Sequence, residues 1–514
     1  MTLALALVVT AGVAVTPWLP GGPDIYVHVV WAHQVMRCVT QGSAPLWLPD
    51  LNAGFGSPGI RLYSPLGPTL TGLLAAPMGD AGSGVRIGLL AAAALILLVA
   101  RRRGGMGAGL LVVLSPVVLH SLFGRGAVAE FLAVPLLLLV LDDALSGTVA
   151  PVQGGVVLAL LWLLHAPSTL MALGLLALAT LLRRDGQEAR RLAAAGALAA
   201  ALTAWHWLPL ASEMALVANR AALVEGIFEP VRNLLGSPSA HDPTANVWLG
   251  WAAVALLAAM LVGRWWRSDW VRAVLIVVCV LLASPLARPL WELPGPARYL
   301  QFPWRWLLPA ALLAARPLRA GLAGTSGRLA AALVLAPLAF APLPRLVPDP
   351  ALNSAMGWRE AGAAVHEAMG GNPYLVDAAQ NRPRSFDRLA ENIGRFGGRL
   401  VLVGEPGGRV AVASWRPLRR EVTVEVGHDA LLSLRLLEYP FWHVSLDGVP
   451  VSGRGGSGVL TLALPAGRHA ITVWWAGNPR ARTGQWAAAG AAVVASMWCA
   501  LGWWRRRRRN GEAS

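Results

Sequence analysis

"GVRIGLLAAAALILLVARRR", residues 84–103, combines a long apolar run with a cluster of three arginines. Apart from Arg86, residues 84–100 are uncharged, and three arginines follow them directly. A helix of about 20 apolar residues crosses a bilayer, and arginines collect at the cytoplasmic end of such a helix. The stretch therefore predicts a transmembrane helix that ends in the cytoplasm.

The composition of the whole chain agrees with this prediction. Of its 514 residues, 56% are hydrophobic and 14% are charged, whereas a soluble domain carries about 25% charged residues. The net charge of +16 comes from arginine alone, and the arginines cluster at the ends of apolar runs. This clustering indicates membrane topology, so we expect the lipid bilayer as a partner and no nucleic acid. The three cysteines form no disulfide framework.

The positions of the arginine clusters predict the topology. If every cluster is cytoplasmic, the apolar runs between clusters form pairs that leave the cytoplasm and return to it. Residues 2–20 then form an uncleaved first span, and the short, proline-bounded run 66–79 forms a partial helix. We expect an all-α polytopic membrane protein of about 12 spans, with both termini in the cytoplasm. The clusters are Arg101–Arg103, Arg183 and Arg184 with Arg190 and Arg191, Arg264 and Arg267, Arg316 and Arg319, and Arg505–Arg509; the paired runs are 104–120 with 126–141, 151–165 with 167–182, 192–210 with 246–263, 270–287 with 303–318, and 327–344 with 484–504.

The expected outer side carries one long loop and one soluble domain. Residues 1–344 form the transmembrane domain, with 21–83 as its first outer loop. Residues 345–483 form an extracytoplasmic α+β domain, which precedes the last span and basic tail at 484–514. Within 397–476, "EVTVEVGH" alternates apolar and polar residues, and "LDGVPV" contains an Asp-Gly pair typical of a tight hairpin. These patterns predict a β-sandwich.

Ionisable residues collect on the same outer side. Asp24 and His28 follow the first apolar run, at a spacing that brings two side chains together on a helix. Ionisable groups are costly within a bilayer, so those that face inward are functional candidates. A single such residue more often only meets water at a helix end, but the convergence of several on one side favours a shared cavity. The other candidates are Arg125, Glu130, His165, His206, Glu213, Glu292, Arg298, Gln301 and Arg305.

This set of residues suits group transfer from a lipid-linked donor. A carboxylate acts as a general base toward an acceptor hydroxyl, and arginines hold a phosphate or pyrophosphate leaving group. Apolar walls suit a lipid tail. The same groups also suit a protein that transports a lipid-linked substrate, and the composition does not separate the two activities.

Several blocks of sequence resemble a known family. "DIYVH" and "LWLPDLNAGFGSPGIRLYSPLGP" in the first outer loop resemble the bacterial membrane-protein family labelled as related to 6-pyruvoyl-tetrahydropterin synthase, and its YfhO-like relatives. "GRGAVAE", "HAPSTL", "WHWLPLASE" and "LQFPWRW" look like further blocks in the same order, and "LEYPFWHVSLDGVPV" is similar to the YfhO-like ending. The chain shows no soluble zinc-histidine enzyme of the kind that the pterin label describes.

The resemblance implies a GT-C-like membrane glycosyltransferase that moves a sugar from a polyprenyl-phosphate donor to an envelope glycan or glycolipid. In that superfamily an acid just after the first span is the catalytic base, and Asp24 matches this position. We expect no cofactor, because the DxD motif that would suggest a divalent metal is missing, and Leu46 stands where relatives carry an arginine beside the loop tryptophan. The further roles implied are orientation of the base or contact with the acceptor by His28, phosphate binding by Arg125, Arg298 and Arg305, a sugar pocket shaped by Trp47 and Tyr63, and substrate contacts by Glu130, His165 and Gln301.

Two other hypotheses stay open. The first is a non-catalytic protein of envelope assembly or of lipid-linked glycan transport. The second makes the β-sandwich a carbohydrate-binding or partner-docking module that the membrane domain anchors. All three hypotheses place the chain in the bacterial cell membrane, with its active side outside the cytoplasm.

Overall fold

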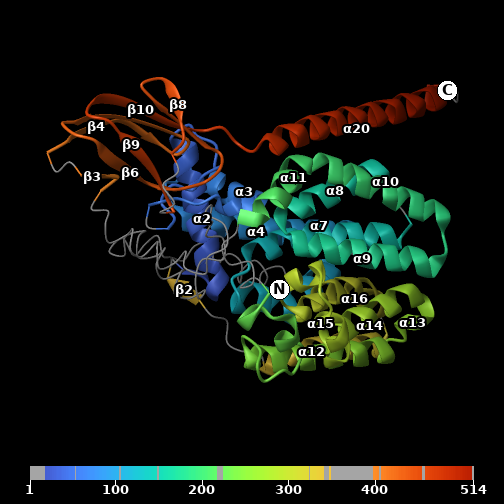
Figure 1. Cartoon of the computed structure of the whole chain (residues 1–514). Coiled ribbons are helices and arrows are strands. Elements are labelled where there is room, and N and C mark those ends of the chain that lie inside the picture. Colours follow the sequence, from blue (N-terminus) through green and yellow to red (C-terminus); the bar gives the residue numbers. More distant parts are fainter. Residues whose placement is uncertain are drawn as a thin grey trace.

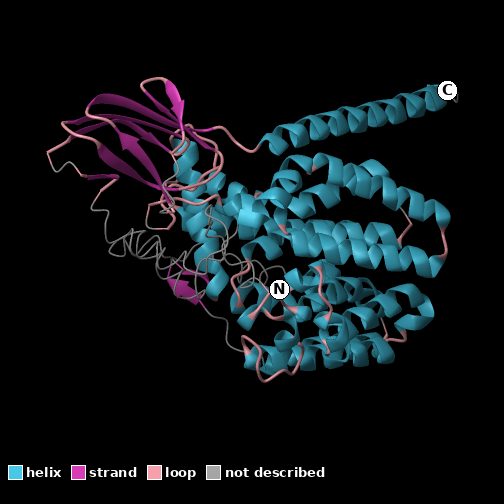
Figure 2. Ribbon diagram, viewed as in Figure 1, coloured by secondary structure: helices cyan, strands magenta, loops and turns pink. Residues whose placement is uncertain are grey.

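The computed structural model describes residues 18–52, 54–103, 106–147, 150–216, 224–322, 324–340, 346–348, 398–404, 407–453 and 458–511 (Figure 1). This part of the chain is mostly helical, and a β-domain precedes the last helix (Figure 2). Most of the expected first span, and most of the expected outer domain before residue 398, lie outside the described residues.

Two short strands join distant parts of the chain. β1 (Trp18–Pro20) pairs antiparallel with β2 (Leu346–Pro348), with Leu19 opposite Val347. The end of the first apolar run therefore lies beside the start of the outer segment. This arrangement agrees with the expectation that both leave the membrane on the same side.

The first outer loop is itself largely helical. α2 (Pro23–Thr40) begins with a proline, where no amide donor is required, and Asp24 in its first turn complements the positive end of the helix dipole. α3 (Leu66–Ala75) follows, and its 10 residues extend over about 15 Å, half of a hydrocarbon core. The run 66–79 is thus too short in its helical part to cross a bilayer, as the proline pattern predicted.

The next helices lie within the expected apolar runs, but some runs that were expected to be single helices are divided into two. The run 104–120 is interrupted at Ser115, whose hydroxyl accepts a hydrogen bond from the amide of Val118 at 3.4 Å and caps a new helix that starts at Pro116. The elements are α4 (Ala81–Arg103), α5 (Met106–Val113), α6 (Pro116–Leu119), a π-helical turn (His120–Gly124), α7 (Val128–Leu145), α8 (Pro151–Leu164), α9 (Ala166–Arg183), α10 (Gly186–Leu202) and α11 (Ala204–Glu213).

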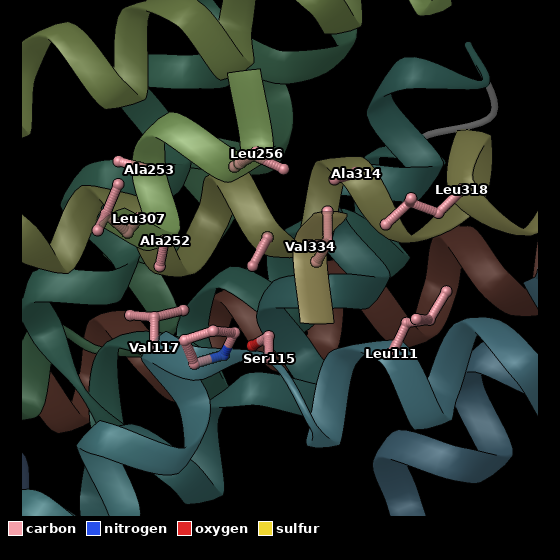
Figure 3. Close-up of a pocket in the computed structure, with 12 residues that line it drawn as sticks. Leu111, Ser115, Val117, Ala252, Ala253, Leu256, Leu307, Ala314, Leu318 and Val334 are labelled. Carbon is pink, nitrogen blue, oxygen red and sulfur yellow. The ribbon is translucent and has the colours of Figure 1, made fainter. Parts of the chain in front are cut away.

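A second group of helices packs on one side of the first (Figure 1). It comprises α12 (Pro243–Val262), α13 (Trp265–Ser268), α14 (Trp270–Ala283), α15 (Arg288–Glu292), α16 (Leu307–Gly321) and α17 (Thr325–Leu335). An apolar cavity of about 30 Å³ lies between α5, α12, α16 and α17, and the side chains that line it include Leu111, Ala253, Leu307 and Val334 (Figure 3). At that volume it holds no more than a few water molecules.

Several helices have the length and apolar character of membrane spans. Among the described residues, four helices meet both criteria, namely 81–102, 166–183, 243–262 and 479–501. The number rises to six if two bent pairs, with bends of 69° after α10 and 75° after α14, each count as one span. The chain is thus a multi-pass membrane protein by these criteria, and the number of about 12 spans stays a prediction.

The C-terminal β-domain consists of two sheets. A five-stranded sheet has the order β4–β5–β10–β7–β8 and a three-stranded sheet has the order β3–β6–β9. Along β5, Val422, Val424 and Val426 are buried and alternate with more exposed residues, as the sequence pattern predicted. The strands are β3 (Leu400–Val403), β4 (Arg409–Arg416), β5 (Arg419–Val426), β6 (Ala430–Leu437), β7 (Trp442–Leu446), β8 (Val449–Val451), β9 (Val459–Leu464) and β10 (Gly467–Trp475).

The first outer loop packs into the hydrophobic core of this domain. Trp47 and Phe55 are fully buried within the same cluster as Leu432 and Val473. The amide of Leu437 also donates a hydrogen bond of 2.9 Å to the carbonyl of Phe55. After the β-domain, α20 (Pro479–Gly511) lies along α11 and then extends beyond the bundle (Figure 1).

Candidate functional site

The candidate site lies where the start of α2 meets the turn before α7. Two glycines allow the backbones to approach. Gly22 has a φ of 103°, and a Cβ on it would lie 2.3 Å from the carbonyl carbon of Arg125. Gly126 has a φ of 69°, and a Cβ on it would lie 2.7 Å from Cβ of Ile25. This close approach lets the amide of Asp24 donate a hydrogen bond of 2.9 Å to the carbonyl of Arg125.

The side chains of Asp24 and Arg125 form an ion pair. Nη2 of Arg125 donates to Oδ2 of Asp24, and the carboxylate side chain remains 26% exposed. The guanidinium of Arg125 lies over the rings of Phe302 and Trp304, at 4.7 and 5.4 Å from their centroids. Aromatic faces stabilise a cation at this range. Asp24 is therefore both anchored and accessible.

Glu130 lies in the first turn of α7 and is more deeply buried than this pair, with only 1% of its side chain exposed. Its Oε1 accepts a hydrogen bond of 2.5 Å from Ser121, and its Oε2 accepts one of 3.2 Å from Nε of Arg305. The same Oε2 lies 3.6 Å from Nη1 of Arg125 and 3.8 Å from Nε2 of His165. Both oxygens of this carboxylate are thus occupied by protein groups.

Arg305 reaches Glu130 from the turn before α16. Its Nη1 also donates a hydrogen bond of 2.7 Å to the carbonyl of Leu300, and its guanidinium lies 4.9 Å from the centroid of Phe302. Phe302 therefore contacts both guanidiniums of the site. Two carboxylates and two guanidiniums balance in charge, which is the condition under which such groups remain buried. We call Asp24, Arg125, Glu130 and Arg305 the charge cluster.

The histidines and Tyr63 surround the charge cluster. Burial lowers the pKa of His28 to about 4, although Asp24 acts in the opposite direction, so this imidazole is neutral at neutral pH. Its ring packs edge-on against Trp31 at 6.1 Å. Tyr63, which packs against the other side of Trp31 at 5.3 Å, lies within electrostatic range of all four cluster residues. Nδ1 of His165 is 2.8 Å from the hydroxyl of Ser168.

Three other residues expected at the site are not members of the charge cluster. Trp47 has no exposed surface, because its indole packs against Tyr439, Trp442 and Trp475 in the core of the β-domain. Its expected role in shaping a sugar pocket stays a prediction that this buried position does not support. Arg298 donates to the carbonyl of Val224 at 3.4 Å, and its expected contact with a phosphate stays a prediction. Gln301 adopts a φ of 60° shortly before Arg305, and its expected substrate role stays a prediction.

A second polar centre was not recognised from the sequence. Glu213 at the end of α11 has 1% of its side chain exposed and pairs with Arg61 of the first outer loop. The hydroxyl of Tyr439 and the amide of Asn478, at 3.0 Å, also donate to this carboxylate. Only Glu213 of these four residues stood out in the sequence, because Arg61 is surrounded by apolar residues and the other two lie more than 200 positions further along.

The described residues include no group of three or more His, Cys, Asp or Glu side chains arranged to hold a metal ion.

Comparisons with known proteins return one match. No family model and no curated protein matches the chain. Among solved structures, the chain is similar to the mycobacterial arabinofuranosyltransferase AftD, determined by cryo-EM, with a TM-score of 0.42 and 18% sequence identity. The match covers 70% of this chain but only 26% of that one, so the present chain spans about a quarter of the length of AftD.

Proposed function

We propose that the chain is a GT-C-like membrane glycosyltransferase that transfers a sugar from a polyprenyl-phosphate donor to an acceptor of the bacterial cell envelope. The observation that carries this proposal is the pairing of Asp24 with Arg125. An accessible carboxylate and an aromatic-backed guanidinium lie together at the end of the helical domain that the predicted topology places outside the cytoplasm. The adjacent β1–β2 pairing supports an extracytoplasmic position for this end.

Asp24 acts as the general base. Its carboxylate accepts the proton of the acceptor hydroxyl while the acceptor oxygen bonds to the anomeric carbon of the donor sugar. The bond between that carbon and the phosphate oxygen breaks, and its electron pair leaves with the polyprenyl phosphate. A positioned carboxylate accelerates such a step by about 10²–10⁴-fold.

Arg125 receives the leaving phosphate. Its Nη1 forms no hydrogen bond with any described residue, since the nearest acid oxygen is 3.6 Å away. A phosphate that binds this nitrogen and displaces Asp24 from Nη2 engages the guanidinium bidentately. The displaced carboxylate is then free to accept a proton, so donor binding and activation of the base occur together.

Glu130 and Arg305 position the reacting groups. Since both oxygens of Glu130 are occupied by Ser121 and Arg305, its carboxylate cannot contact the substrate without losing these partners. Its role is to hold Arg305 and Arg125 against Phe302. We assign this positioning role to Glu130 in place of the expected substrate contact, and Nε2 of His165 lies 3.8 Å from its Oε2.

Reconstituted vesicles with a polyprenyl-phosphate sugar test the role of Asp24. Asp24→Asn keeps the shape of the side chain but removes the base, and we expect at least a hundredfold loss of sugar transfer. Asp50→Asn is a matched control, because Asp50 lies in the same loop, is 27% exposed and also pairs with an arginine, Arg37. Full transfer by Asp24→Asn refutes the assignment. Transport of the lipid-linked donor that survives in Asp24→Asn but is lost in Arg125→Gln supports the transport hypothesis instead.

A further inference from the structure

A larger cavity lies at the junction of the helical domain, the β-domain and α20. It has a volume of about 460 Å³, within the usual range for a small-ligand site. Its walls come from the first outer loop and α3, from α11, from the end of β10 and from the first two turns of α20. No residue of the charge cluster lines it.

One part of the wall is apolar. Leu46, Trp205, Leu210, Leu418 and Trp475 all line the cavity. Trp205 is 36% exposed and Leu46 is 38% exposed, so neither is fully covered by the protein. Aromatic and aliphatic surfaces of this kind accept the carbon skeleton of a ligand.

The charged groups that remain available in the cavity are cationic. Glu213 lines it, but its oxygens already accept hydrogen bonds from Arg61, Tyr439 and Asn478. Nη1 of Arg61, by contrast, is buried and has no hydrogen-bond partner among the described residues. Arg482 also lines the cavity and forms no ion pair with the described part of the chain. Two guanidiniums therefore contribute the available charge of the cavity, and guanidiniums favour a phosphate or carboxylate.

The position of the cavity indicates where the ligand comes from. Ala481, Arg482 and Gln485 belong to the start of α20, whose residues 479–501 have the length and hydropathy of a membrane span. The start of a span lies at the level of the lipid headgroups. Trp205 and Trp207 of α11, which are 36% and 37% exposed, fit the same level because tryptophan is enriched at membrane interfaces.

We propose that this cavity binds the phosphate-ester headgroup of an anionic membrane lipid. Arg61 and Arg482 contact the phosphate, and Trp205 and Trp475 pack along the backbone of the lipid. The site goes beyond the proposed glycosyl transfer, because its residues include neither Asp24 nor Arg125. Bound lipid would connect α11, α20 and the β-domain at the membrane surface.

Photo-crosslinking of the full-length protein tests this site. The protein is reconstituted in phosphatidylcholine vesicles with a minor fraction of phosphatidic acid that carries a photoreactive group near its headgroup. We expect labelled peptides from α11 and from the first turns of α20. Unlabelled phosphatidic acid should compete with labelling, whereas soluble glycerol 3-phosphate should not.

Three variants separate the cavity from nonspecific attraction. Arg482→Gln should lower labelling about tenfold, as expected for the loss of a charge-assisted contact. Ala481→Trp should lower it similarly, because it fills the cavity without any change in charge. Arg480→Gln is the matched control: it removes the same charge from the same helical turn, but Arg480 does not line the cavity.

The outcomes that overturn the proposal are specific. Equal labelling of the Arg480→Gln and Arg482→Gln variants would show attraction to the charged helix end rather than binding in the cavity. Equal competition by glycerol 3-phosphate would show a site for free phosphate esters rather than for lipid. Labelling lost in Asp24→Asn would place the lipid at the charge cluster, whereas normal labelling of an inactive Asp24→Asn leaves both proposals separate and intact.

Discussion

The hydroxyl of Tyr439 donates a hydrogen bond to Oε2 of Glu213, which lies 226 residues earlier in the chain. Glu213 ends α11 in the helical domain, and Tyr439 follows β6 in the β-domain. Arg61 and Asn478 bind the other oxygen of the same carboxylate. One buried acid thus connects the first outer loop, the helical domain, the β-domain and the segment that leads into α20.

Tyr439→Phe should weaken this connection. Burial raises the pKa of Tyr439 far above its ordinary value, so its hydroxyl stays a donor at any physiological pH. Removal of the hydroxyl leaves one oxygen of Glu213 without this partner, and we expect the free energy of unfolding to fall by about 1–3 kcal/mol. Urea unfolding of the full chain in detergent measures this change. Tyr299→Phe, at a tyrosine that is 46% exposed, is the control and should have no effect.

Glu130→Gln should cost more stability than a typical charge substitution. The variant keeps the size of the side chain but leaves the guanidiniums of Arg305 and Arg125 without their buried counter-charge. We expect a loss of about 3–5 kcal/mol in the free energy of unfolding, together with loss of sugar transfer. Glu292→Gln breaks an exposed ion pair with Arg288 and should be neutral. Equal unfolding curves for the two variants would contradict a positioning role for Glu130.

The sequence was informative where local pattern and burial coincide. Apolar runs predicted the positions of α4, α9 and α12 because a buried or lipid-facing helix is apolar along its whole length. Alternation predicted β5, and the Asp447-Gly448 pair predicted the β7–β8 turn, where both residues have positive φ values of 53° and 81°. The bend after α10 was missed, since hydropathy continues through Thr203 without a break.

The candidate site was accessible from the sequence only in part. The predicted topology placed all four residues of the charge cluster on one side of the membrane. Their contacts, however, depend on close packing of distant backbone segments, such as that of Gly22 against Arg125. The burial of Trp47 in the β-domain did not follow from the sequence, because the packing of its loop there is a contact over hundreds of residues. No local pattern encodes such a contact, and Arg61 escaped notice for the same reason.

The stability of the β-domain should depend on pH through His469 and Asp447. Nδ1 of His469 lies 2.7 Å from Oδ2 of Asp447, and its Nε2 lies 2.9 Å from the carbonyl of Pro465, so both ring nitrogens face acceptors. The hydrogen bond with Asp447 raises the pKa of His469, and the same bond lowers the pKa of Asp447. The histidine contribution is complete below about pH 6.5 and is lost as the pH rises through the raised pKa.

The carboxylate contribution has the opposite direction. It is complete above about pH 4 and is lost as the pH falls through the lowered pKa. The pair therefore stabilises the domain most between about pH 4 and 6.5. Melting temperatures of the full wild-type chain should therefore fall as the pH rises above about 6.5 and through the raised pKa of His469. Asp447→Asn, which tolerates the φ of 53° at this position, should flatten that dependence.

Gly22→Ala should disrupt the contact between the start of α2 and the turn that carries Arg125, and thereby the candidate site. A Cβ at this position would lie 2.5 Å from the carbonyl oxygen of Gly124 and 2.3 Å from the carbonyl carbon of Arg125, and backbone atoms cannot rotate away as a side chain does. The start of α2 must then move from the turn that carries Arg125, which breaks the hydrogen bond between the amide of Asp24 and the carbonyl of Arg125. We expect sugar transfer to fall as far as in Asp24→Asn.

Gly79→Ala is the control for this last variant, because Gly79 also has a positive φ, 65°, but a Cβ on it would meet nothing within 4 Å. It should cost only the backbone strain of a left-handed alanine, about 1–2 kcal/mol, and leave transfer intact. Transfer rates and urea unfolding of both variants test the difference. If Gly22→Ala were destabilised no more than Gly79→Ala and remained active, the close approach of α2 to Arg125 would not be required for the site.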